Sequence, residues 1–174
     1  MPDRDEQDER IAKIFLGVKT GSEVNLRGLG RYRAYLRANL KRPCLLTGSS
    51  DFPWEERFIL GAGTKNREEY EELKTTRASY TDTFRLMSFY KELYESAGLL
   101  VNVRRTSDRK RFLLPLADLK PTDKQSENCQ LMNDYSVWLF NEQATFRGSW
   151  GCWDEVLPTP RAGRRKARSR AVAR

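Results

Sequence analysis

Residues 99–116, L-L-V-N-V-R-R-T-S-D-R-K-R-F-L-L-P-L, decide the fold that this sequence predicts. Leu99, Val101 and Val103 alternate with residues on the opposite face, which is typical of a strand with one buried face. A polar turn follows, and a second apolar run restarts at Phe112. The segment therefore predicts a β-hairpin.

Downstream of the hairpin the apolar period changes from that of a strand to that of a helix. Leu131, Tyr135, Trp138 and Leu139 lie on one helical stripe, in a segment that begins near Ser126. Because an isolated hairpin is only marginally stable in water, we expect this helix to cover it. Trp138 is then predicted to be buried against the hairpin.

The segments before the hairpin contain further helices and strands. Leucines and tyrosines at helical spacing predict an amphipathic helix over residues 30–39, which ends before Pro43. A second helix is predicted to begin at Asn66, where Glu69 completes a capping box. Apolar runs predict three strands, over residues 44–47, 58–60 and 84–89.

Length and composition divide the chain into one domain and several extensions. A chain of 174 residues with 39% hydrophobic residues is long enough for one domain with a core. The predicted boundaries are an N-terminal extension at 1–23, partly disordered, a single α+β domain at 24–142, an aromatic C-terminal extension at 143–157, and a disordered basic tail at 158–174.

The positive charge of the chain is concentrated in that tail. The net charge is +8, and residues 161–174 contain seven basic residues and no acid. Such a tail attracts nucleic acid through counterion release, and arginines around the hairpin add a second basic cluster. An alternative function is therefore nucleic-acid association, with the candidate contacts Arg104, Arg105, Arg109, Arg164, Arg165, Lys166 and Arg168.

The sequence lacks the residues and motifs that several classes of enzyme and metal-binding protein require. There is no histidine, so the usual triads and histidine metal sites are absent, and Cys44, Cys129 and Cys152 form no C-x-x-C pair. The glycines at 61 and 63 are not part of a strand–loop–helix phosphate motif. We therefore predict that the protein is not an enzyme. No signal segment or membrane span is apparent, which predicts a cytoplasmic protein.

Acidic residues at turns are the candidate metal ligands. The calcium candidates are Asp51, Glu55, Glu56, Asp118 and Asp123, which lie beside predicted turns and strand ends. Calcium takes six to eight oxygen ligands and accepts irregular sets of them. Each carboxylate also has a structural interpretation, as a turn residue, a helix cap or a solvated side chain. Both interpretations stay open at this stage.

Four phrases of the sequence resemble a known group of proteins. They are Y-R-A-Y-L-R-A-N-L-K-R-P-C-L-L-T-G from residue 32, D-F-P-W-E-E from 51, S-Y-T-D-T-F from 79, and the stretch L-P-L-A-D-L-K-P-T-D to S-V-W-L-F-N that begins at 114. Over residues 31–142 the chain resembles a group of small uncharacterised bacterial proteins. More distantly, it is similar to the cyanobacterial calcium-binding protein family.

The resemblance implies a fold and a possible ligand. It implies an N-terminal helix and a C-terminal helix packed on a small, strongly bent β-sheet or Src-homology-3-like barrel of about five strands, and it makes Ca²⁺ a candidate cofactor. Together with the residue patterns, it predicts a small non-enzymatic binding module for calcium or a protein partner.

Overall fold

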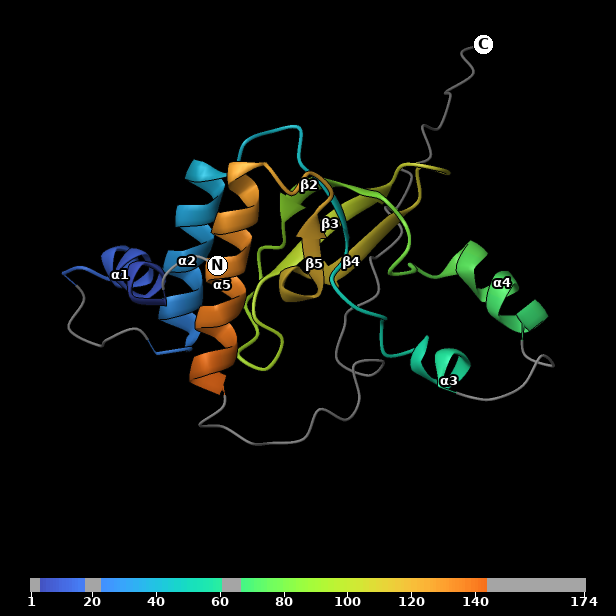
Figure 1. Ribbon diagram of the computed structural model, residues 1–174, viewed down its shortest axis with the longest axis horizontal. Helices are drawn as coiled ribbons and strands as arrows, with labels where there is room; N and C mark the ends of the chain where they lie inside the picture. The colour runs from blue at the N-terminus through green and yellow to red at the C-terminus, as the bar shows by residue number, and fades with distance from the viewer. Residues whose placement is uncertain (1–3, 18–22, 61–66, 144–174) are drawn as a thin grey trace, which may run out of the picture.

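The computed structural model describes residues 4–17, 23–60 and 67–143 (Figure 1). In chain order the elements are α1 Arg4–Ile14, α2 Leu26–Asn39, β1 Leu45–Gly48, α3 Glu56–Ile59, α4 Arg67–Thr76, β2 Phe84–Phe89, β3 Leu100–Arg105, β4 Arg111–Pro115, the 3-10 helix η2 Leu116–Asp118, β5 Leu119–Pro121 and α5 Glu127–Gln143. Figure 1 shows α1, α2 and α5 on one side of the sheet, and α3 and α4 projecting on the other.

One antiparallel sheet of five strands forms the β layer, in the order β4-β3-β2-β1-β5. The predicted hairpin is confirmed as β3 and β4, with Val101 opposite Leu114 and Val103 opposite Phe112. The α+β class is therefore confirmed. The barrel is not, because β4 and β5 are the two edges of an open sheet. The short helix η2 separates them in the chain, and no strand in the described part pairs them.

The helical layer is built around stacked aromatic rings. Trp138 of α5 is 2% exposed, as predicted, but the rings that stack on it come from α2 and from the residue after α1, rather than from the hairpin. Its ring stacks on Tyr32 of α2 at a centroid distance of 4.8 Å and on Phe15 at 5.4 Å. Rings in such offset arrangements add to the free energy gained by burial alone. The three helices are therefore held together at one aromatic centre.

A buried polar contact fixes α1 onto α5. The Asp134 carboxylate is buried and accepts hydrogen bonds from Gln7 Nε2 at 2.8 Å and from Arg10 Nε at 2.9 Å. Ile11 and Ile14 of the same helix belong to the core cluster. The packed part of the protein therefore begins before residue 24, the predicted start of the domain.

Two elements differ from the sequence prediction. Residues 58–60 were expected to be a strand, but they form the end of helix α3 and the residue after it. This expectation was wrong because a three-residue apolar run does not distinguish a strand from a helix. The fifth strand is instead β5, which pairs with β1 and contains only three residues. The other predicted helices and strands are confirmed within a few residues at each end.

Candidate functional site

A pocket of about 290 Å³ opens between the free edge of β4 and the chain that follows β1. Its walls are residues 52–54, residues 76–78 at the end of α4, residues 112–115 and Asp118. Trp54 is fixed in one wall because its indole Nε1 donates a hydrogen bond to the Ala78 carbonyl at 2.7 Å. We call this feature the Asp118 pocket. Concave sites with apolar walls and a few polar groups are typical of ligand binding.

Two charged side chains line this pocket. The Arg77 guanidinium lies over the Trp54 ring, 5.8 Å from its centroid, and the Asp118 carboxylate is half-buried. The Asp118 backbone is fixed by Ser49, whose N–H donates to the Asp118 carbonyl at 2.8 Å. Within the described ranges, no group donates a hydrogen bond to the carboxylate itself, and no basic side chain pairs with it. Burial alone therefore raises the pKa of Asp118 from 3.8 to about 6. An acid with a raised pKa in a pocket makes this pocket the candidate functional site.

Asp118→Asn is expected to stabilise the protein at neutral pH. Because the folded protein holds the Asp118 proton more tightly than the unfolded chain, stability falls as pH rises from about 4 to about 6 and then levels off. At pH 7 the cost is at most about 3 kcal/mol, since one pKa unit corresponds to about 1.4 kcal/mol. Urea unfolding between pH 4 and 8 measures both the gain and the loss of pH dependence in the variant.

Asp123→Asn is the matched control for this experiment. Asp123 is exposed, and its carboxylate accepts one hydrogen bond, from the Gln125 N–H at 2.9 Å. Its replacement is expected to change stability by less than about 0.5 kcal/mol at any of these pH values. If both variants followed the wild-type pH profile, burial of Asp118 would not be costly and the pocket would lose its distinguishing charge.

Glu55, another calcium candidate, is a buried structural carboxylate. It has no exposed surface, and both of its oxygens are engaged. The Ser79 hydroxyl and the Tyr70 hydroxyl donate to Oε1 at 2.6 and 3.0 Å. The backbone N–H groups of Phe52 and Tyr80 donate to Oε2 at 3.1 and 3.0 Å. Four donors satisfy this carboxylate, which joins the loop after β1 to α4 and to the chain before β2.

Arg105, one of the predicted nucleic-acid contacts, is also buried. Its side chain lies on the same strand face as Val101 and Val103, and the residue is 3% exposed. The guanidinium donates to Asp108 Oδ1 and Oδ2 at 3.0 and 2.6 Å and to Asp82 Oδ2 at 2.9 Å. A buried Arg105 engaged by these carboxylates does not fit the predicted contact with nucleic acid. These bonds raise the pKa of Arg105 and hold the pKa of Asp108 well below its usual range.

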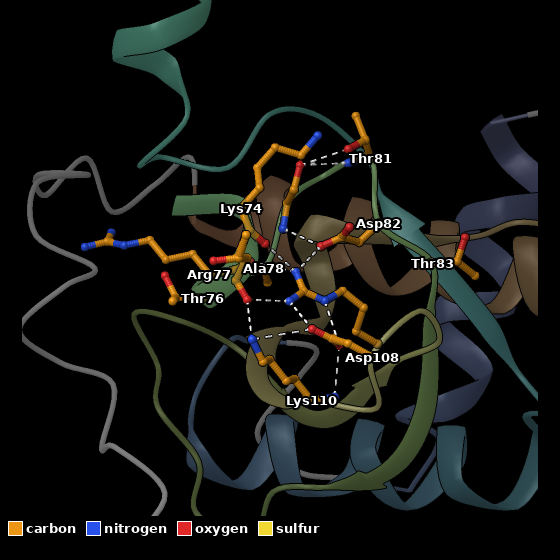
Figure 2. Close-up of polar contacts among 12 residues, drawn as sticks. Lys74, Thr76, Arg77, Ala78, Thr81, Asp82, Thr83, Asp108 and Lys110 are labelled. Carbon is orange, nitrogen blue, oxygen red and sulfur yellow. Dashed lines mark hydrogen bonds and ion pairs between the residues drawn. The ribbon is translucent and has the colours of Figure 1, made fainter. Parts of the chain in front are cut away.

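The same guanidinium closes the end of helix α4. It donates to the carbonyls of Lys74, Thr75 and Arg77 at 2.8, 3.0 and 2.9 Å. Carbonyls in the last turn of a helix have no partner within the helix, and a positive charge there is favourable. Figure 2 shows Asp82, Asp108 and Lys110 gathered beside the chain between Lys74 and Ala78. Arg105 therefore anchors the residues that form one wall of the Asp118 pocket.

The remaining predicted site residues lie apart from this pocket wall or outside the described ranges. Asp51 is half-buried and Glu56 is exposed. Arg104 is half-buried on the sheet face opposite Arg105, and Arg109 is exposed in the β3–β4 turn with a φ of 63°. The predicted tail contacts, Arg164, Arg165, Lys166 and Arg168, lie outside the described residues.

The structure does not assemble the acidic candidates into a metal site. Within residues 4–17, 23–60 and 67–143, no three histidine, cysteine, aspartate or glutamate side chains form a group that could hold a metal ion. Of the five calcium candidates, only Asp118 lines the pocket. In the same part of the chain, no helix is long and apolar enough to cross a membrane.

Sequence patterns alone did not identify the residues that form the pocket. Trp54 and Phe112 are both half-buried in the pocket walls and also pack against the core. One available signal was the period of β3, which places Arg105 on the face of Val101 and Val103 and so indicates a buried charge. No comparable signal joins residues 52–54 to Phe112, because these segments meet only in the folded chain.

Comparison with known proteins identifies a structural neighbour. No family model matches the sequence, and no curated protein matches it. The fold is similar to that of the crystal structure of Anabaena CcbP, a calcium-binding protein, with a TM-score of 0.52 and 12% sequence identity. The match covers 80% of this chain and 93% of that chain. At this identity the likeness concerns the fold, and it agrees with the resemblance to the cyanobacterial calcium-binding family.

Proposed function

We propose that this protein is a non-enzymatic binding module and that it binds a cationic, partly apolar ligand in the Asp118 pocket. The observation that carries the proposal is the half-buried Asp118 carboxylate, which has no partner in the described part of the chain. A carboxylate in apolar surroundings is costly to keep ionised, and an incoming cation removes that cost. The surrounding rings and aliphatic side chains then bury the apolar part of the ligand.

Phenethylamine is a simple probe of this pocket, because it combines an ammonium group with an aromatic ring. We expect the full-length protein to bind it with amide chemical-shift changes confined to residues 52–54, 76–78 and 112–118. Since the ammonium group binds only the ionised acid, affinity is expected to rise between pH 5 and 7, across the Asp118 pKa of about 6. The measurement is a titration followed by two-dimensional amide NMR.

Phenylethanol is the matched neutral probe, and Asp118→Asn is the matched variant. The variant is expected to weaken amine binding at least tenfold, which corresponds to about 1.4 kcal/mol, and to leave phenylethanol binding unchanged. Equal affinities of amine and alcohol for the wild-type protein would contradict a cation site. Shift changes elsewhere on the surface would contradict this pocket.

Calcium is the second candidate ligand, and the fold shared with Anabaena CcbP favours it. The described residues provide one free pocket carboxylate, whereas calcium takes six to eight oxygens, so they do not form a complete calcium site. We therefore expect only a small calcium effect on the thermal unfolding midpoint. Full-length protein with millimolar calcium, magnesium or a chelator, at constant ionic strength, tests this expectation.

The thermal unfolding midpoints measured with calcium, magnesium and chelator distinguish specific calcium binding from a general effect of divalent ions. A calcium-specific rise that Asp118→Asn removes would assign the ion to the pocket. A ligand at a hundredfold excess over its dissociation constant stabilises the folded state by about 2.7 kcal/mol, so a shift of that size would contradict our expectation of weak binding. Association with nucleic acid stays a prediction. It rests on the tail residues, which lie outside the described ranges, and on Arg104 and Arg109 of the hairpin, because Arg105 is buried.

A further inference from the structure

The shape of the Asp118 pocket identifies it as a groove along a strand edge. Four consecutive residues of β4, 112–115, line it. Successive side chains of a strand point to opposite faces of the sheet, so a pocket on one face would be lined by every second residue. A pocket that contacts all four lies along the edge of the strand. β4 is an edge strand of the sheet, with β3 as its neighbour.

The hydrogen-bond pattern of the hairpin shows which backbone groups face this groove. Leu116 N donates to the Leu99 carbonyl, and Arg105 N donates to the Lys110 carbonyl. In an antiparallel pair, hydrogen-bonded residue pairs alternate with pairs whose backbone groups point away from each other. The register therefore places the N–H and C=O of Leu113 on the outer side of β4, between the two ladder pairs formed by Phe112 and Leu114. Neither of these Leu113 groups forms a hydrogen bond with a described residue.

Unpaired edge groups of this kind are the usual site for the addition of another strand. The edge is short, because β4 ends at Pro115, which has no N–H to donate. It therefore fits a segment of about three to five residues, given the rise of about 3.3 Å for each strand residue. Beside this edge lies the carboxylate of Asp118, which lacks a cationic partner in the described chain.

We propose that the groove binds an extended peptide segment of another protein, which adds a strand to the edge of β4 and directs a lysine or arginine side chain at Asp118. The peptide backbone bonds to the outer N–H and C=O of Leu113, and its apolar neighbours contact Trp54 and Phe112. This inference rests on the proposed function and names its ligand class. The basic charge of the peptide is complementary to Asp118, the one carboxylate among the residues that line the groove. The other charged lining residue, Arg77, has its guanidinium over the Trp54 ring, 5.8 Å from the ring centroid.

The test uses a capped pentapeptide, Thr-Val-Lys-Val-Thr, and the full-length protein. We expect amide shift changes along β4 and next to Asp118, and slower hydrogen exchange of the Leu113 amide in the complex. Replacement of the central lysine by norleucine is expected to weaken binding at least tenfold. In Asp118→Asn that difference between the two peptides is expected to disappear, because the carboxylate that pairs with the lysine ammonium is absent.

The backbone contact has its own variant. Leu113→Pro removes the outward N–H of the edge without removing a bond of the β3–β4 ladder, so the protein is expected to fold and to lose peptide binding at least tenfold. A peptide N-methylated at its central amide tests the same contact without changing the protein. Equal affinity of the methylated and unmethylated peptides, or of the lysine and norleucine peptides, would overturn the proposal.

The phenethylamine and pentapeptide experiments together show whether the peptide proposal fails alone or together with the proposed function. If phenethylamine binds the pocket and the pentapeptide does not, the peptide proposal fails while the proposed function stands. If neither binds, both fail. Self-association of the free protein that Leu113→Pro abolishes would assign the edge to a second copy of the chain, which would also overturn the peptide proposal.

Discussion

Replacing Arg105 with alanine is expected to lower the free energy of unfolding by about 3–5 kcal/mol, the range for removing one partner of a buried ion pair. The guanidinium satisfies the carboxylates of Asp82 and Asp108 and three carbonyls at the end of α4. Without it, Lys110 Nζ still reaches Asp108 and the Thr75 carbonyl. Asp82 and the carbonyls of Lys74 and Arg77 lose their charged donor. Urea unfolding at pH 7 measures the loss.

Arg104→Ala is the matched control, because Arg104 is the adjacent residue on the opposite face of β3 and is half-buried. We expect a change of less than about 0.5 kcal/mol for this variant, as for most surface substitutions. Arg105→Lys keeps the charge but loses the planar fork that reaches several acceptors at once, so most of the loss is expected to remain. A loss below about 1 kcal/mol for Arg105→Ala would contradict the anchoring role.

Local exchange data separate anchoring from general destabilisation. Arg105 holds the carbonyls of residues 74, 75 and 77, so its loss is expected to release α4 before the sheet opens. Amide hydrogen exchange in α4 is expected to accelerate in Arg105→Ala under conditions in which β3 keeps its protection. The pocket wall at residues 76–78 is expected to loosen with α4, which would weaken phenethylamine binding.

The parts of the fold that were predicted correctly are those with long, regular apolar patterns. The hairpin and the C-terminal helix both continue their periods over several turns or residue pairs, and the structure confirms them as β3, β4 and α5. Helix α3 was misread because residues 58–60 contain only three apolar positions. Strand β5 was missed because it contains three residues, one of which is a proline.

The candidate site was harder to predict, because it depends on contacts between distant segments. Asp118 and Glu55 look equivalent in the sequence, since both are acids beside a turn. The structure gives Glu55 four hydrogen-bond donors and places Asp118 in an apolar pocket with none among the described residues. The difference arises from Ser79 and Tyr80, more than 20 residues beyond Glu55 in the chain. Single-sequence patterns do not record such long-range partners.

The second large effect is expected at Trp138. Trp138→Ala removes a side chain that is 2% exposed and stacks on both Tyr32 and Phe15, so we expect a loss of about 3–5 kcal/mol in the free energy of unfolding. Urea unfolding should be followed by far-ultraviolet circular dichroism, because the substitution also removes an indole fluorophore. Phe140→Ala is the matched control on the same helix, since Phe140 is 43% exposed, and it is expected to cost less than about 1 kcal/mol.

Tyr32→Phe tests whether the Tyr32 hydroxyl contributes to the stability of the aromatic centre. The Tyr32 hydroxyl is buried and has no hydrogen-bond partner among the described residues, so removing it keeps the ring and deletes only an unsatisfied polar atom. This variant is expected to be neutral or slightly stabilising. In Trp138→Ala, by contrast, Phe15 loses its stacked partner, and faster hydrogen exchange is expected in α1. An unchanged unfolding free energy in Trp138→Ala would show that the three helices pack through their aliphatic residues, and that the aromatic centre does not hold α1 in place.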